Sequence, residues 1–149
     1  MKPRTILFTL AICIAAFAVC FAQEAQMGTW KLNEAKSKFP AGAGKNHTVV
    51  YAASGDSVKV TVDGVDKDGK PTHNEWTGKF DGKEYPVTGD PTSDMRSYKK
   101  LSSHKLELTA TKGGKTTLTG TVVVSADGKT RTVTTKSGKN STTAVYDKQ

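Results

Sequence analysis

Six side chains have the types and the spacing expected of a small-molecule binding site. They are Trp76, Phe80, Arg96, Tyr98, Arg131 and Tyr146. Trp76 and Phe80 fall on one face of an alternating segment, where aromatic rings either line an apolar cavity or pack as plain core. Arg96 and Tyr98 share a face of a later segment: pointing inward they would anchor an anion, and pointing outward they would be solvated surface. Arg131 shares its parity with an apolar neighbour and is a second interior candidate.

Residues that could perform catalysis or bind a metal do not form a recognisable set. The three histidines, His47, His73 and His104, have no partner at ligand spacing apart from Glu75 on the strand face of His73. The chain contains no Gly-x-Ser-x-Gly elbow and no glycine-rich phosphate loop ahead of a helix. We therefore expect no catalytic residues, no cofactor and no metal, and a protein that is not an enzyme.

The candidate residues lie on segments with the two-residue period of half-buried strands. Val58, Val60 and Val62 alternate with polar residues, as do Leu106 and Leu108. A weak helical period occurs only near residues 33–39. Strands are expected near 28–33, 46–53, 57–66, 72–80, 83–87, 94–101, 104–111, 115–125, 130–136 and 140–147.

Glycine turns separate these segments roughly every ten to fifteen residues. Asp68-Gly69-Lys70, Asp81-Gly82-Lys83 and Asp127-Gly128-Lys129 repeat one tight-turn solution. Short hairpins joining many strands make a meander, and a meander of this size usually closes because closure removes its edges. The sequence predicts an all-β fold, an antiparallel up-and-down meander of about eight to ten strands closing into a lipocalin-like β-barrel.

The N-terminal residues 1–22 have the pattern of a signal peptide. Lys2 and Arg4 precede an apolar run that ends with small residues ahead of a cleavage point after Ala22. The run is too short for a comfortable membrane span, so we expect a protein that does not cross the membrane. Lipid attachment at Cys20 is the alternative, but it is disfavoured because Val19 stands where that signal requires a small residue. Export to the periplasm or outside the cell is expected.

The mature chain, residues 23–149, is expected to form one domain. It contains no cysteine, because Cys13 and Cys20 are lost with the signal peptide, so its core and sheet closure must hold it. The formal charge of +8 falls to +6 without Lys2 and Arg4, since all 14 acidic residues remain. Lysines are spread over the turns rather than clustered, a pattern that fits a soluble monomer and argues against a nucleic-acid partner.

The two ends of the mature chain resemble those of the calycin-like superfamily, the lipocalins and fatty-acid-binding proteins. Gly28-Thr29-Trp30-Lys31-Leu32 resembles the first strand of these barrels, and Val145-Tyr146-Asp147-Lys148 resembles the closing strand of fatty-acid-binding proteins. The resemblance implies that Trp30 seals the barrel floor and that the interior holds a hydrophobic molecule. The chain looks like an exported, bacterial-style member of this group.

Two departures separate the chain from fatty-acid-binding proteins. Residues 33–45 have room for one helical turn and a loop, not for the helix pair that covers those barrels. Ala144 stands where that family places its ligand-binding arginine, two residues before Tyr146. Arg131, on the adjacent strand, is the candidate to replace it.

The function expected from these observations is binding of a small hydrophobic or amphipathic ligand by an exported protein. The alternative is a filled barrel that acts through its rim loops as an envelope or secreted interaction module, for example an inhibitor. The chain has few aromatic residues with which to fill a barrel of this size, which favours a pocket.

Overall fold

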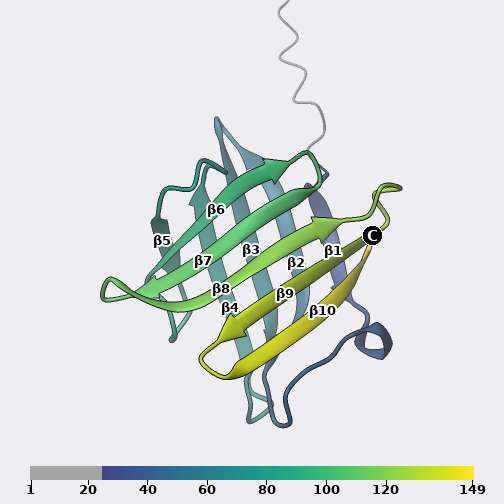
Figure 1. The fold of residues 1–149 in the computed structure, drawn as a ribbon, viewed down its shortest axis with the longest axis vertical. Coiled ribbons are helices and arrows are strands. Elements are labelled where there is room, and N and C mark those ends of the chain that lie inside the picture. Colours follow the sequence, from purple (N-terminus) through teal and green to yellow (C-terminus); the bar gives the residue numbers. More distant parts are fainter. Residues whose placement is uncertain (1–24) are drawn as a thin grey trace, which may run out of the picture.

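The computed structural model describes residues 25–149, which form one antiparallel sheet of ten strands closed into a barrel (Figure 1). The expected signal peptide, residues 1–22, lies outside the described residues. One 3₁₀ turn, η1 (Glu34–Lys36), follows the first strand. The strands are β1 (Gly28–Leu32), β2 (Lys45–Ser54), β3 (Ser57–Val65), β4 (Pro71–Gly78), β5 (Tyr85–Thr88), β6 (Met95–Ser102), β7 (Lys105–Lys112), β8 (Lys115–Val124), β9 (Thr130–Ser137) and β10 (Asn140–Lys148).

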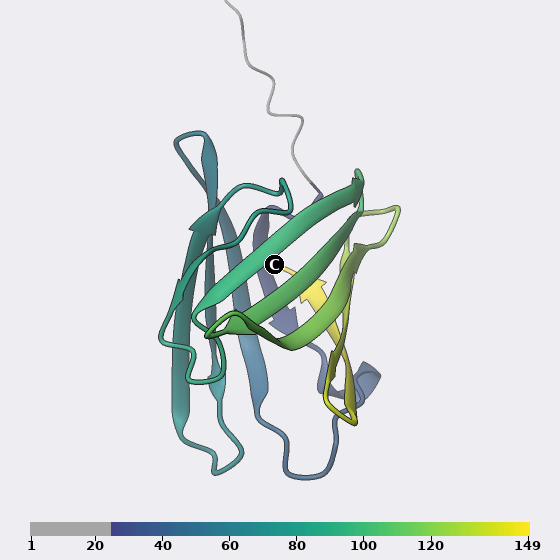
Figure 2. The same cartoon turned by 60° about the vertical axis from the view of Figure 1, so that its left-hand side comes forward.

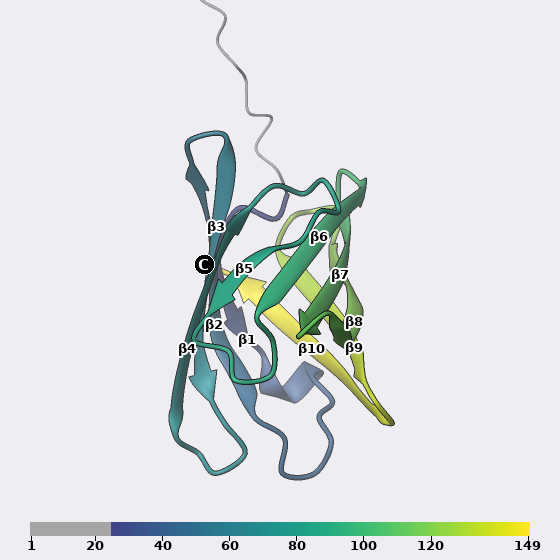
Figure 3. The ribbon, with the colours of Figure 1, turned by 90° about the vertical axis from the view of Figure 1, so that its left-hand side faces the viewer.

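Each strand pairs with its neighbours in sequence, and β1 pairs with β10 to complete the ring. In that closing pair Trp30 lies opposite Lys148 and Leu32 lies opposite Tyr146. Figures 2 and 3 show the result from the side: β2–β4 form one wall, and β6–β9 form the wall facing it. The predicted all-β meander and its closure are confirmed, with ten strands.

Two of the recurrent Asp-Gly-Lys turns share one hydrogen-bonding pattern. Their aspartate carboxylate accepts a hydrogen bond from the backbone N–H of the lysine two residues on: Asp81 from Lys83 and Asp127 from Lys129. In the third turn, Asp68-Gly69-Lys70, the N–H of Lys70 donates instead to Asp66, which precedes the turn. The glycine of each turn has a positive φ, which an L side chain rarely adopts. These turns hold the strand ends in register, so every second side chain of each strand points into the barrel.

The end of the barrel where β1 begins is closed by packed aromatic side chains. Trp30 is fully buried, and its indole N–H donates to the backbone oxygen of Gln26, 2.9 Å away. Trp76 lies 4.8 Å from Tyr98 and is stacked with Phe80, measured between ring centroids. Trp30 is thus buried at the closed end, the place expected for the residue that seals the floor.

Backbone pairing in the barrel is sparsest at β5, where only two residue pairs join this strand to each of its neighbours. The indole N–H of Trp76 on β4 donates to the backbone oxygen of Arg96 on β6, 2.8 Å away. This side-chain bond joins the two strands across the short β5. Trp76 therefore holds the wall together where the backbone ladder is sparse.

Candidate functional site

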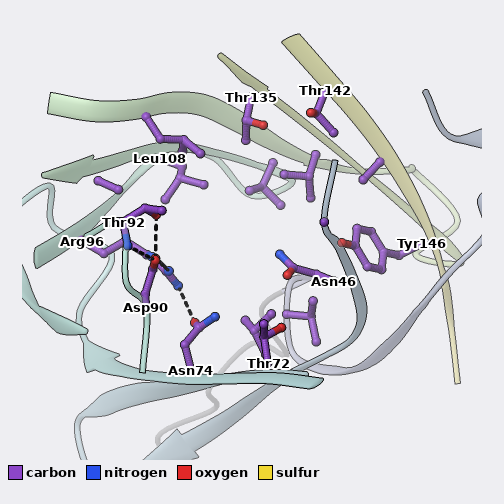
Figure 4. A pocket seen from close by; sticks show the side chains of 18 of the residues that line it. Asn46, Thr72, Asn74, Asp90, Thr92, Arg96, Leu108, Thr135, Thr142 and Tyr146 are labelled. Carbon is purple, nitrogen blue, oxygen red and sulfur yellow. Dashed lines mark hydrogen bonds and ion pairs between the residues drawn. The ribbon is translucent and has the colours of Figure 1, made fainter. Parts of the chain in front are cut away.

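The opposite end of the barrel opens into a cavity of about 380 Å³ (Figure 4). This volume lies within the range of small-molecule sites, which are mostly apolar with a few placed polar groups. The middle of its wall is aliphatic, with side chains from both faces of the barrel: Val49, Val62, Leu108, Ala110, Val122 and Val133. The interior is therefore not completely filled by side chains.

Arg131 carries a positive charge to the wall of this cavity. It stands on β9 opposite Tyr146 of β10, and only 3% of its surface is exposed. Its Nη2 donates to the Tyr51 hydroxyl at 2.6 Å, whereas Nε and Nη1 have no acceptor among residues 25–149. Buried guanidinium groups normally pair with an acid, because an unpaired buried charge is costly. Arg131 is thus a buried cation with two hydrogen-bond donors to spare.

Three aromatic rings surround that guanidinium. Its carbon lies 4.4 Å from the ring centre of Tyr51, 5.7 Å from that of Tyr146 and 5.9 Å from that of Trp30. Ring faces attract a cation at these distances and also exclude solvent from it. The rings hold the charge in place without neutralising it.

The tyrosines beside Arg131 remain protonated. Burial raises the pKa of Tyr146 to about 12, although the positive charge of Arg131 opposes this shift. Burial also raises the pKa of Tyr51 far above its ordinary value, again against the influence of Arg131. Both phenols are therefore neutral at physiological pH, and the net charge around Arg131 is positive.

Arg96 also faces the cavity, but a carboxylate neutralises it. Its Nη2 lies 3.1 Å from Asp90 Oδ2, and its Nη1 donates to Asn74 Oδ1 at 3.3 Å (Figure 4). Burial raises the pKa of Asp90, but hydrogen bonds from Ser93 and Thr92 and the nearby Arg96 charge outweigh this and leave the pKa lowered. Arg96 points inward, yet its charge is balanced within the protein.

The structure separates the six candidate residues into two groups. Arg96, Tyr98, Arg131 and Tyr146 line the cavity. Trp76 and Phe80 are not among its lining residues: they pack with Tyr51, Tyr98 and Tyr85 in the aromatic core, where Trp76 is 1% exposed. Plain core, the alternative interpretation of this pair, fits their position.

Sequence reasoning missed Tyr51 and Asp90, which decide the electrostatics of the two arginines. Tyr51 has the same parity as Val49 on β2, so its inward direction was readable from the alternation. Asp90 lies in the loop between β5 and β6, and no periodic signal places a loop carboxylate beside an arginine six residues on. Its neighbour Ser93 is almost fully buried, which shows that this loop folds against the barrel.

Residues 25–149 contain no group of three or more His, Cys, Asp or Glu side chains arranged to hold a metal ion. His73 lies on the exposed face of β4, where its Nδ1 is 2.6 Å from Asp63 Oδ1 and its Nε2 is 3.4 Å from Glu75 Oε1. Hydrogen bonds with Asp63 and then Glu75 raise its pKa.

No helix in the described part of the chain is long and apolar enough to cross a membrane.

Comparison with known proteins places the barrel among the fatty-acid-binding folds. No family model and no curated protein matches the chain. Fatty-acid-binding protein 1 of Echinococcus granulosus is similar in structure, with a TM-score of 0.62 and 18% identity over 84% of this chain and 98% of that one. Schistosoma mansoni fatty-acid-binding protein in complex with arachidonic acid has a TM-score of 0.57, 20% identity and coverage of 84% and 96%. The REP1-NXSQ fatty acid transporter has a TM-score of 0.56, 15% identity and coverage of 83% and 95%.

These similarities define the class of the fold. The chain is a ten-stranded closed barrel with the fold of these fatty-acid-binding proteins. The resemblance noted at the two chain ends is thus confirmed for the fold as a whole.

Proposed function

We propose that this protein binds a small amphipathic molecule whose anionic head, such as a carboxylate, pairs with Arg131 inside the barrel. The observation that carries the proposal is the guanidinium at the cavity wall with Nε and Nη1 free of any acceptor in residues 25–149. Each of these N–H groups can donate a charge-assisted hydrogen bond to a carboxylate oxygen, and such bonds are stronger than those between neutral groups. The aliphatic wall between Arg131 and the opening suits the apolar part of the same ligand.

The size of the cavity supports a ligand-binding role over the alternative of an interaction module. That alternative depends on a filled interior, whereas about 380 Å³ is open here. A share of roughly 30 Å³ for each water-sized group gives room for at least about a dozen non-hydrogen atoms. A medium-chain carboxylic acid is of this size.

The proposal extends to the biological setting of the protein. The pattern of residues 1–22 supports export to the periplasm or outside the cell, and the sequence contains no Gly-x-Ser-x-Gly elbow. We propose a monomeric, non-catalytic carrier whose mature form begins at Gln23. N-terminal sequencing of the secreted protein tests the cleavage site, and an N-terminus at Met1 would contradict it.

Displacement of the fluorescent probe anilinonaphthalene sulfonate from residues 23–149 tests the binding role. We expect dodecanoate to displace the probe far more effectively than dodecanol, because only the acid pairs with Arg131. Arg131→Met should remove the preference for the acid. The matched control is Lys136→Met, which removes a positive charge from the outer face of the same strand and should keep it.

Equal displacement by the acid and the alcohol would contradict the anionic head group. No displacement by either ligand, together with a bare mass in native mass spectrometry of the protein purified without denaturation, would contradict ligand binding altogether.

A further inference from the structure

The opening of the cavity carries a second set of polar side chains, well separated along the strands from Arg131. Four uncharged residues with hydroxyl or amide groups line this part of the wall. They are Asn46 on β2, Thr72 on β4, Thr135 on β9 and Thr142 on β10. We call them the mouth residues.

The register of the sheet arranges the mouth residues as two pairs. Thr135 and Thr142 are direct cross-strand partners on the inner face. Asn46 and Thr72 both lie opposite Gly64, one on each side of it. A Cβ on Gly64 would come within 2.1 Å of the Lys45 backbone oxygen, so β2 packs closely against this position and no side chain fits between the pair.

The two pairs face one another across the cavity. Figure 4 shows Thr135 and Thr142 on one wall, with Asn46 and Thr72 on the side opposite. The dashed lines in that view join Arg96 to Asp90 and Asn74 and join Thr92 to Asp90, but they reach none of the four mouth residues. Their hydrogen-bonding groups are thus uncommitted among the residues drawn.

The choice of threonine at these inner positions is informative. Valine has nearly the same shape and an equal preference for strands, and the inner wall uses it at Val62, Val122 and Val133. Strand propensity alone therefore does not require a hydroxyl at Thr135 or Thr142. The hydroxyls add hydrogen-bonding capacity without charge.

The strands fix the separation between the mouth residues and the Arg131 site. Arg131 and Thr135 are four residues apart on β9, and Tyr146 and Thr142 are four apart on β10. At about 3.3 Å per residue, four residues span about 13 Å. An extended backbone covers this length in roughly 11 to 12 covalent bonds, which is the length of a chain of about 10–12 carbons.

We infer that the ligand carries a second, neutral hydrogen-bonding group at the end away from its anionic head, as in an ω-hydroxy carboxylic acid of about 10–12 carbons. This inference rests on the proposed function and specifies its ligand class. The anion pairs with Arg131, the methylene chain crosses the aliphatic wall, and the terminal hydroxyl exchanges hydrogen bonds with the Thr135–Thr142 pair of the mouth residues.

Competitive displacement of anilinonaphthalene sulfonate by dodecanoate and by 12-hydroxydodecanoate tests this inference on residues 23–149. One added hydrogen bond should make the hydroxy acid bind about two- to tenfold more tightly than dodecanoate. The double variant Thr135→Val and Thr142→Val should bind both acids equally. The matched control is Thr134→Val with Thr143→Val, a cross-strand pair on the outer face of the same two strands, and it should keep the preference.

Each outcome bears on a different claim. If dodecanoate binds and the hydroxyl adds nothing, this inference is overturned while the proposed function stands. A preference for the hydroxy acid that survives in the inner double variant also overturns the inference, because Thr135 and Thr142 would not be its hydrogen-bonding partners. If neither acid displaces the probe, the proposed function fails and this inference fails with it.

Discussion

Replacing Arg131 by methionine distinguishes a ligand anchor from a structural cation. A methionine keeps much of the length of the side chain and removes the guanidinium. A hydrogen bond to a charged group contributes about 1.5–3 kcal/mol, so losing the donors Nε and Nη1 should cost at least about 1.5 kcal/mol of carboxylate binding. The expected result is at least about tenfold weaker binding of dodecanoate, with little change for dodecanol.

The same variant should leave the stability of the ligand-free protein almost unchanged. The substitution loses the hydrogen bond to Tyr51, worth about 1.5–3 kcal/mol, and cation–ring contacts of about 0.5–1 kcal/mol each. It also removes two buried donors without acceptors, each costing about 1–3 kcal/mol. These contributions are similar in size and opposite in sign, so the free energy of unfolding should change by less than about 1 kcal/mol.

Two measurements check this prediction: guanidinium chloride unfolding without ligand, followed by tryptophan fluorescence, and probe displacement by dodecanoate. Breaking a buried structural ion interaction usually costs about 3–5 kcal/mol. A loss of that size with unchanged dodecanoate affinity would refute the reasoning, because it would make Arg131 a part of the scaffold. Lys136→Met should change neither quantity.

Three further predictions follow from contacts outside the Arg131 site. Trp76→Phe leaves the backbone oxygen of Arg96 without its donor, so it should lower the free energy of unfolding by about 1–3 kcal/mol. The affinity for dodecanoate should not change, and weaker dodecanoate binding would indicate that Trp76 contacts the ligand. Gly120→Ala places a Cβ 2.3 Å from the backbone oxygen of Thr134, so its thermal midpoint should fall; an unchanged midpoint would show that β8 and β9 shift freely. The lowered pKa of Asp90 means that its carboxylate stabilises the fold above about pH 4 and that this stability is lost as the pH falls further. Asp90→Asn should therefore unfold with a weaker pH dependence below about pH 4 than the unmodified protein, and an identical pH profile would contradict this.

The sequence predicted the barrel well because its signals are local. Alternation along Ser57–Val65 and the glycine turns mark strands and their ends, and these depend on residues close together in the chain. The same alternation gives the inward direction of Arg131, since parity decides the face. The structure agrees with the sequence in these respects.

The contents of the interior could not be read in the same way. Alternation places Trp76 and Phe80 on one face but does not say whether that part of the barrel is packed or open. The difference between Arg96 and Arg131 depends on Asp90, a loop residue whose carboxylate reaches one arginine and not the other. Charge balance of this kind is a tertiary property, and the local pattern does not contain it.

The pairing of β1 with β10 has a consequence for how the chain folds. Trp30 and Lys148 meet across this pairing, and the backbone N–H of Gln149 donates to the oxygen of Thr29. Contacts between such distant residues form slowly, and until they form, β1 and β10 each present an unpaired edge on which another chain can add a strand. The nine residues of β10 therefore convert an aggregation-prone open sheet into a molecule without edges.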